Sequence, residues 1–371
     1  MKKKNKLILP VIIWAACIAL LYILDRTLPS GHMLFIVLKK GAIYALVAVS
    51  MNLLNGFTGL FSLGQAGFML IGAYTYAIFT IPVEAKGRVY QYYDCIVNFS
   101  LPVVVALILA GLFAAVFAWL IGLPVLRLKS DYLAIATLGF AEIIKAVFLW
   151  KPLGPITNGS NLLKNFPTFN SLIPATSRFY PIYTKHIAFF STLFPLAVAA
   201  ICITLVVLLI NSSYGRAFKA IREDEIAAEA MGINLARHKR LSLCASSFFA
   251  GIGGALLAMF QATIAAAQFK SAMTYELLLI VVIGGIGSIS GSCIASFLFV
   301  ACSEWWLRFL DSEIVLANVF KVPFLRNGFR LVVFSVIIMI VVLFFRRGIM
   351  GDQELPDLLR KRLKRKKEAV Q

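Results

Sequence analysis

The sequence contains few charged residues for its length. Asp, Glu, Lys and Arg together make up 14% of its 371 residues, whereas 60% are hydrophobic, and the mean hydropathy is +0.87. Soluble domains are about 25% charged and about 45–50% apolar. The composition therefore excludes an ordinary soluble domain and predicts an all-α, polytopic membrane protein.

Residue patterns that carry metal, redox or hydrolytic chemistry are also scarce. The three histidines fall near the ends of hydrophobic runs and none of the six cysteines forms a CxxC pair, so we expect neither a metal site nor a disulfide framework. The sequence lacks a GxxxxGK(S/T) phosphate-binding loop, an HExxH motif and a GxSxG motif, which carry much of the known nucleotide and hydrolytic chemistry. We therefore expect no catalytic residues, no enzyme activity and no cofactor in this chain.

Positive charge is abundant, and much of it lies at the two ends of the chain. The formal net charge is +19. Basic residues that flank membrane spans mark the cytoplasmic side and contact anionic lipid headgroups, and no motif that reads nucleic acid accompanies them. We therefore expect the lipid bilayer as a partner and no nucleic acid. The terminal basic residues are Lys2, Lys3, Lys4, Lys6, Arg346, Arg347, Arg360, Lys361, Arg362, Lys364, Arg365, Lys366 and Lys367.

Hydrophobic runs that could cross a bilayer recur along the chain. A helix needs about 20 apolar residues to cross the hydrocarbon core, and by this measure we expect about ten spans. The chain divides into an N-terminal basic segment with a retained first span (1–30), a membrane core (31–345) and a basic tail (346–371). The expected spans are 7–24, 34–54, 60–81, 101–123, 132–150, 187–210, 240–260, 275–283, 293–307 and 329–345.

Two of the hydrophobic segments are interrupted by glycine. The first interruption runs from Gly56 to Gly67 and the second from Gly284 to Gly291. Irregular backbone at membrane depth is tolerated where protein or a water-filled cavity satisfies its polar groups, whereas small residues also permit close helix packing. A translocation path and tight packing are thus both open interpretations. The candidate path residues here are Ser62, Gln65, Gly284, Gly285 and Gly287.

Glu142 and Lys145 are ionisable residues inside the expected span 132–150. They lie three positions apart, so that on a helix they share one face and can form an ion pair. Charges inside a membrane are costly and often functional. The pair is therefore either a second candidate for the translocation path or a structural ion pair that faces the helix bundle.

The longest strongly polar run between hydrophobic segments is 211–239. Its charges cannot lie in hydrocarbon, and counting spans from a cytoplasmic N-terminus places both this run and the C-terminus in the cytoplasm. Asp224 suits a helix N-cap and Glu225 the first helical turn, while Gly232 is a natural C-terminal stop. We expect a short exposed helix of about two turns with its core at Arg222–Gly232.

Four stretches resemble one family, the branched-chain amino-acid ABC-transporter permeases of the LivM type. The most specific is SSYGRAFKAIREDEIAAEAMGINLARHK (212–239), which resembles the cytoplasmic coupling segment of these permeases. The other three are NLLNGFTGLFSLGQAGFMLIGAY (52–74), ATLGFAEIIK (136–145) and VVIGGIGSISGSCIA (281–295). The resemblance covers roughly residues 35–345, so that residues 31–345 would form a permease core with its coupling loop at 211–239.

The resemblance implies an importer-type ABC permease fold in a bacterial cytoplasmic membrane. The expected partners are a second, homologous permease, two cytoplasmic ATPase subunits that hold ATP and magnesium, and an external substrate-binding protein. The expected substrates are branched-chain or related hydrophobic amino acids. Other permeases of the family carry urea, amides or other amino acids, and a secondary transporter or channel, an intramembrane enzyme and a structural scaffold remain competing hypotheses. The residues expected to couple to the ATPase are Arg216, Arg222, Glu223, Asp224, Glu225, Glu229 and Gly232.

Overall fold

The structure, a computed structural model, describes residues 18–93, 95–128, 130–172, 180–308, 315–316, 320–321, 332–336, 339, 343, 348–351 and 354. Within these residues regular secondary structure is almost entirely helical. The exceptions are the antiparallel pair of two-residue strands β1 (Val315–Leu316) and β2 (Phe320–Lys321) and one isolated bridge between Leu163 and Ile264. The all-α prediction is therefore confirmed for the described part of the chain.

The helices include both long spans and short connecting turns. Residues 18–27 are helical, and the labelled elements follow them. In chain order these are α2 (Met33–Asn52), the π-helix η1 (Leu53–Phe57), α3 (Gln65–Thr80), α4 (Val83–Val89), α5 (Val103–Val125), α6 (Ser130–Leu149), η2 (Lys151–Leu153), α7 (Gly154–Thr157), α8 (Tyr180–Lys185), α9 (Ile187–Asn211), α10 (Ser213–Glu223), α11 (Glu225–Ala230), α12 (Leu235–Gln261), η3 (Ala266–Gln268), α13 (Ser271–Gly284), α14 (Ile289–Ala301) and the π-helix η4 (Cys302–Trp306).

Six helices in the described residues are long and apolar enough to cross a membrane, which fits a polytopic membrane protein. The predicted count of about ten spans is not confirmed. The helix predicted at 60–81 begins only at Gln65 because irregular backbone precedes it, and most of the spans predicted at 7–24 and 329–345 lies outside the described residues. The six helices are Met33–Phe57, Val103–Val125, Tyr132–Leu149, Ile187–Asn211, Leu235–Gln261 and Ile289–Trp306.

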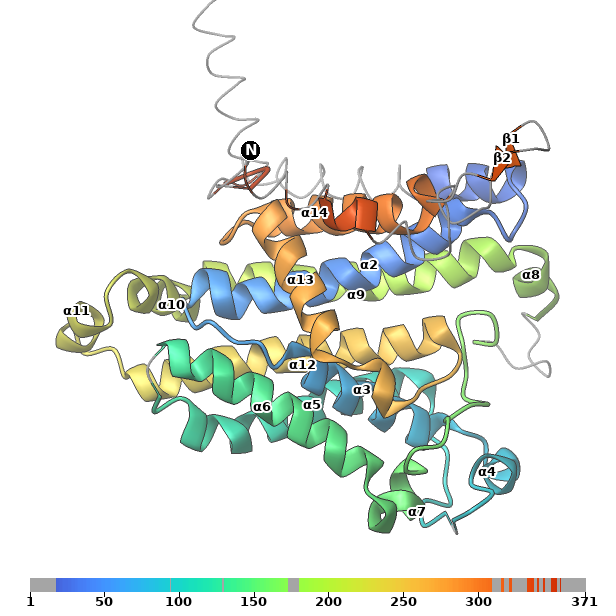
Figure 1. Cartoon of the computed structure of the whole chain (residues 1–371), viewed down its shortest axis with the longest axis horizontal. Coiled ribbons are helices and arrows are strands. Elements are labelled where there is room, and N and C mark those ends of the chain that lie inside the picture. Colours follow the sequence, from blue (N-terminus) through green and yellow to red (C-terminus); the bar gives the residue numbers. More distant parts are fainter. Residues whose placement is uncertain are drawn as a thin grey trace, which may run out of the picture.

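The long helices run roughly along the long axis of the molecule (Figure 1). The helices α10 and α11 project at one end, and α4, α7 and α8 lie at the other. Helix α12 contacts α2, α3 and α5, and together with α2 it is the most buried of the candidate spans. The helices α5, α6 and α9 are less buried, so that their apolar faces are available to lipid.

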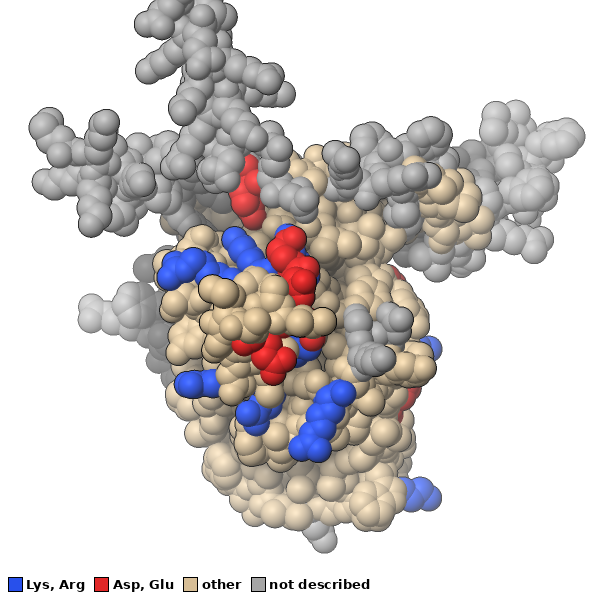
Figure 2. Space-filling model, turned by 90° about the vertical axis from the view of Figure 1, so that its left-hand side faces the viewer, with Lys and Arg blue, Asp and Glu red and all other residues tan. Residues whose placement is uncertain are grey.

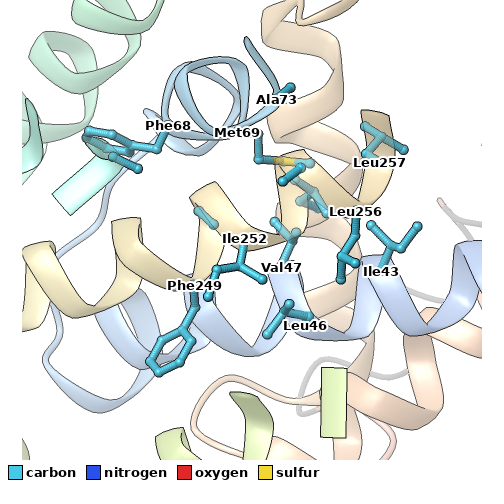
Figure 3. Close-up of a cluster of buried hydrophobic side chains, with 14 of the residues drawn as sticks. Ile43, Leu46, Val47, Phe68, Met69, Ala73, Phe249, Ile252, Leu256 and Leu257 are labelled. Carbon is cyan, nitrogen blue, oxygen red and sulfur yellow. The ribbon is translucent and has the colours of Figure 1, made fainter. Parts of the chain in front are cut away.

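The core lies where α2, α3 and α12 meet (Figure 3). Backbone contact between α3 and α12 is very close, since a Cβ atom built on Gly72 would lie 2.0 Å from the carbonyl oxygen of Gly251. Small residues allow membrane helices to approach in this way. The labelled core side chains are Ile43, Leu46, Val47, Phe68, Met69, Ala73, Phe249, Ile252, Leu256 and Leu257.

Candidate functional site

The polar segment, residues 211–239, forms much of one end of the molecule. It contains α10, α11 and the first turn of α12. Lys, Arg, Asp and Glu side chains gather on the face of the molecule at this end (Figure 2). Helix α12 begins at Leu235 rather than at the predicted position 240, because the Asn234 side chain accepts a hydrogen bond from the Arg237 amide and caps a polar first turn. The prediction of a structured polar segment is confirmed, although its two ends, Asn211 and residues 235–239, belong to the candidate spans Ile187–Asn211 and Leu235–Gln261.

Helix α11 is capped at both ends as the sequence predicts. The Asp224 carboxylate accepts hydrogen bonds from the amides of Ile226 (2.8 Å) and Ala227 (3.1 Å). At the other end Gly232 adopts a φ of 84°, and the Ile233 amide donates to the Ala228 carbonyl at 3.1 Å. These bonds satisfy backbone groups that a helix end leaves free.

The predicted extent of this helix is wrong at its start. Asp224 has extended backbone (φ −158°, ψ 114°), so it separates α11 from α10. Arg222 and Glu223 therefore form the last turn of α10 and do not belong to the capped helix. The polar segment is a pair of helices joined at Asp224, and its exposed tip consists of α11 and its C-cap residue Met231.

Two large apolar side chains lie at this tip. Ile226 is 81% exposed and Met231 is 83% exposed, although both stand among charged residues. Apolar groups that protrude into water at the end of a capped helix are suited to a pocket on a partner protein. Neither residue was among the predicted coupling residues. The sequence feature that could have indicated them is the presence of two large apolar residues in an otherwise polar stretch.

The charged side chains predicted in this segment have different surroundings. Glu225 forms an ion pair with Lys239 at 2.6 Å, and Glu223 forms one with Arg222 at 2.7 Å. Exposed ion pairs of this kind contribute little to stability, about 0–1 kcal/mol each. The side chains exposed on the segment include Arg216, Glu223, Asp224, Glu225 and Glu229.

Helix α10 is held against the first glycine-containing break. The Arg222 guanidinium donates a hydrogen bond to the Gly56 carbonyl at 2.9 Å, and the Lys219 ammonium lies 5.6 Å from the centre of the Phe57 ring. Gly59 also lies against Arg222, since a Cβ atom on Gly59 would be 2.9 Å from Arg222 Cγ. The polar segment is thus joined directly to the irregular backbone that follows α2.

Hydroxyl groups from other helices satisfy this irregular backbone. The Thr137 hydroxyl of α6 accepts a hydrogen bond from the Leu63 amide at 3.0 Å, and the Thr274 hydroxyl of α13 accepts one from the Ala66 amide at 3.2 Å. Thr58 also shares a hydrogen bond with Ser242 of α12 at 2.6 Å. Non-helical backbone at membrane depth requires such partners, and the break between α2 and α3 confirms the predicted irregularity.

Ser62 and Gln65, two predicted path residues, are buried beside this break, with 3% and 2% of their surface exposed. The Ser62 amide donates to the Asn55 side chain at 3.1 Å. The Gln65 side-chain amide donates to the Ser50 hydroxyl at 2.7 Å. These contacts hold the break together, and their role in transport stays a prediction.

The second break, Gly285–Ser288, joins α13 to α14 and meets the first through one side chain. The buried Asn52 amide donates to the Ser288 carbonyl (2.9 Å) and to the Ser292 hydroxyl (2.9 Å), and its oxygen accepts from the Gly287 amide at 2.8 Å. A Cβ atom on Gly56 would lie 2.6 Å from the Gly287 nitrogen. The two glycine-containing breaks are therefore in contact, which the sequence did not indicate.

A short C-terminal piece also contacts the second break. The Ile349 amide donates to the Ile283 carbonyl at 2.7 Å. The Glu354 carboxylate accepts from the amides of Ile289 (2.7 Å) and Ser290 (3.1 Å), so that it caps the start of α14. Helix α14 consequently begins at Ile289, four residues before the predicted span 293–307.

The predicted pair in α6 is formed. Lys145 and Glu142 make an ion pair, and the other Glu142 oxygen accepts a hydrogen bond from the Ser271 hydroxyl at 2.5 Å. The pair thus connects α6 to the first residue of α13. This contact fits the structural interpretation, while a role in the translocation path stays a prediction.

Comparisons with known proteins give one consistent result. A family model for the branched-chain amino acid transport system permease component matches residues 33–345. The high-affinity branched-chain amino acid transport system permease protein LivM of Escherichia coli (strain K12) is 34% identical over 278 residues, which cover 71% of this chain and 61% of that protein. The protein of the same name from Salmonella typhimurium gives the same identity and coverage.

An archaeal relative matches over a longer stretch at lower identity. The probable branched-chain amino acid transport permease protein LivM of Methanocaldococcus jannaschii is 21% identical over 352 residues, which cover 88% of this chain and 95% of that protein. The chain spans only 61% of the length of the two enterobacterial relatives. No solved structure matches the chain significantly.

Proposed function

The chain belongs to the family of branched-chain amino acid transport permease components, and from this premise we propose that it is a membrane-spanning subunit of an ATP-driven importer. The proposed substrates are branched-chain or related hydrophobic amino acids. Residues 31–345 would form the permease core, with an importer-type ABC permease fold and about ten spans. The family match over residues 33–345 supports this division.

The observation that carries the proposal is helix α11. It is capped by Asp224 at its start and exposes Ile226 and Met231 at the polar end of a largely apolar molecule. A helix of this kind can dock into a groove on a partner through its apolar residues. Because the sequence has no phosphate-binding loop of the GxxxxGK(S/T) type, we assign ATP and magnesium to two partner ATPase subunits. The other proposed partners are a second, homologous permease and an external substrate-binding protein.

The contacts behind α11 offer a route by which movement of the ATPase would reach the spans. Arg222 at the end of α10 donates to Gly56, and Asn52, one turn before Gly56, is bonded to the second break at Gly287 and Ser288. A rigid-body shift of α10 would therefore move both breaks together. Helix shifts at interfaces are one common way in which such signals are transmitted.

The proposed orientation follows from the same end of the molecule. If α11 docks on a cytoplasmic ATPase, the opposite end with α4, α7 and α8 faces outward (Figure 1). Both termini would then be cytoplasmic, as the basic residues at each end of the sequence suggest. The membrane would be the bacterial cytoplasmic membrane.

The docking role of α11 is tested by substitutions at its exposed tip, compared with a control substitution at the other end of the molecule. Ile226→Asp combined with Met231→Asp should abolish co-purification of the ATPase subunits and uptake of leucine, while the permease still inserts into the membrane. The matched control is Ile96→Asp, which alters a residue that is 67% exposed at the far end of the molecule and should leave ATPase co-purification intact.

Normal ATPase co-purification by the double variant would contradict the docking role of α11. The substrate class is tested separately, by measuring uptake of leucine, urea and a short aliphatic amide in vesicles that contain the intact transporter and its binding protein. Uptake of urea or the amide without uptake of leucine would overturn the proposed substrate.

A further inference from the structure

A cavity of about 490 Å³ lies between α2, α13 and the end of α14. These three helices contact one another. Its wall combines charged and apolar side chains. Lys40 comes from α2, Glu276 from α13 and Glu304 from η4. Charged groups at this depth in a span are costly unless they are paired or functional.

One carboxylate in this cavity has no bonded partner among the described residues. The Lys40 ammonium forms an ion pair with Glu304 at 2.5 Å. Among the described residues no hydrogen-bond donor or ion-pair partner lies within bonding distance of the Glu276 carboxylate. Glu276 is therefore a carboxylate without a bonded counter-charge among the described residues, and the cavity is suited to a ligand that brings an ammonium group to it. Lys40 has three N–H donors, so that it can bind a carboxylate while still contacting Glu304.

The rest of the wall is mostly apolar and aromatic, with the two serines Ser303 and Ser335 among its lining residues. Leu279, Phe299 and Phe334 line the cavity, and the rings of Phe299 and Phe334 pack edge to face with their centres 4.8 Å apart. Such a surface favours an aliphatic side chain over a polar one. Ammonium, carboxylate and aliphatic side chain are the three parts of an aliphatic amino acid.

The cavity lies in the half of the molecule away from α11. Lys40 stands seven residues after the start of α2 at Met33, about 10 Å along the helix. The end of α2, in contrast, leads to Gly56 and the contact with Arg222. In the proposed orientation this half is the one to which a binding protein delivers its substrate.

We propose that this cavity is a binding site for an aliphatic α-amino acid, in which Glu276 binds the ammonium group, Lys40 binds the carboxylate and Leu279, Phe299 and Phe334 contact the side chain. The assignment rests on the proposed function, since that function supplies the substrate class. Glu304 would hold Lys40 in position. The site would let the permease itself select substrate after the binding protein has released it.

The experiment measures binding of radiolabelled leucine to the complete permease–ATPase complex in lipid nanodiscs without the binding protein. On the wild-type complex, 4-methylpentanoate lacks the ammonium group and 3-methylbutylamine lacks the carboxylate, so both should compete less well than unlabelled leucine. Glu276→Gln and Lys40→Gln should each weaken leucine binding by about tenfold or more, as loss of a charge-assisted hydrogen bond does. The exposed Glu84→Gln in α4 is the control and should bind leucine as the wild type does.

Glu304→Gln distinguishes a ligand site from a structural ion pair. It removes the ion pair but keeps both ligand-binding charges, so that leucine binding should fall far less than in Lys40→Gln. Equal losses in these two variants, or unchanged binding in Glu276→Gln, would overturn the proposal. The proposal would also be overturned if the wild-type complex bound no leucine but imported leucine with its binding protein. That result would leave the proposed function standing. A wild-type complex that imports no amino acid would instead overturn the proposed function.

Discussion

Replacing Arg222 by Ala should uncouple ATP hydrolysis from transport without detaching the ATPase. The side chain donates to the Gly56 carbonyl at 2.9 Å and so connects α10 to the first break. Alanine removes this bond but leaves Asp224, which caps α11, and the exposed tip of α11 in place. The docking helix should therefore still bind its partner, while its movement reaches the spans less effectively.

The magnitude follows from the type of bond and its exposure. A hydrogen bond to a charged group contributes about 1.5–3 kcal/mol. The Arg222 side chain is 33% exposed, so that solvent competes and the lower end of the range, about 1.5 kcal/mol, applies. Since about 1.4 kcal/mol corresponds to a factor of ten, we expect roughly tenfold less substrate transported per ATP hydrolysed.

The assay reconstitutes the complete transporter in proteoliposomes and measures leucine uptake and phosphate release on the same sample. Arg127→Ala, which removes an exposed arginine in another polar turn, is the matched control and should keep the wild-type ratio. A wild-type ratio in Arg222→Ala, or loss of the ATPase subunits from that variant, would refute the role assigned to the contact with Gly56.

Two further substitutions test the supports of this arrangement. Asn52→Leu should lower the free energy of unfolding by about 1–3 kcal/mol, because it leaves the part-buried Gly287 amide, which donates to the Asn52 side chain, without that partner. Thermal unfolding in detergent measures this effect, and Asn211→Leu at an exposed site is the control. An unchanged midpoint would contradict the reasoning. Asp224→Ala should destabilise α11 by about 1 kcal/mol, so that hydrogen exchange of the Ile226 and Ala227 amides becomes several times faster; equal exchange rates would show that the Asp224 cap contributes nothing.

Features set by neighbouring residues could be predicted from the sequence. The cap at Asp224 and the stop at Gly232 depend on local backbone geometry, and both are found. The positions of both breaks were also predictable, because glycine-rich segments with hydroxyl residues form poor regular helices. The six candidate spans lie where long apolar runs predicted them, with ends that differ by a few residues.

Features that depend on distant contacts could not be predicted. No local pattern indicates that Asn52 bonds to Ser288, 236 positions away, or that the hydroxyl of Thr137 satisfies the amide of Leu63. Helix α10 was missed because Gly215 interrupts its first turn and the charges that follow resemble a loop. The exposure of Ile226 could not be predicted either, since it depends on which face of α11 the rest of the chain covers.

The bonds of Asn52 have a consequence for how the protein is made. Its partners at Gly285, Ser288 and Ser292 lie 233, 236 and 240 residues further along the chain. At about 5–20 residues per second, a ribosome takes roughly 10–50 seconds to synthesise that interval. Throughout this time α2 has already been delivered to the membrane, but the side-chain amide of Asn52 lacks its final partners. Until the last third of the chain has been inserted, α2 therefore depends on water or the insertion machinery to satisfy Asn52.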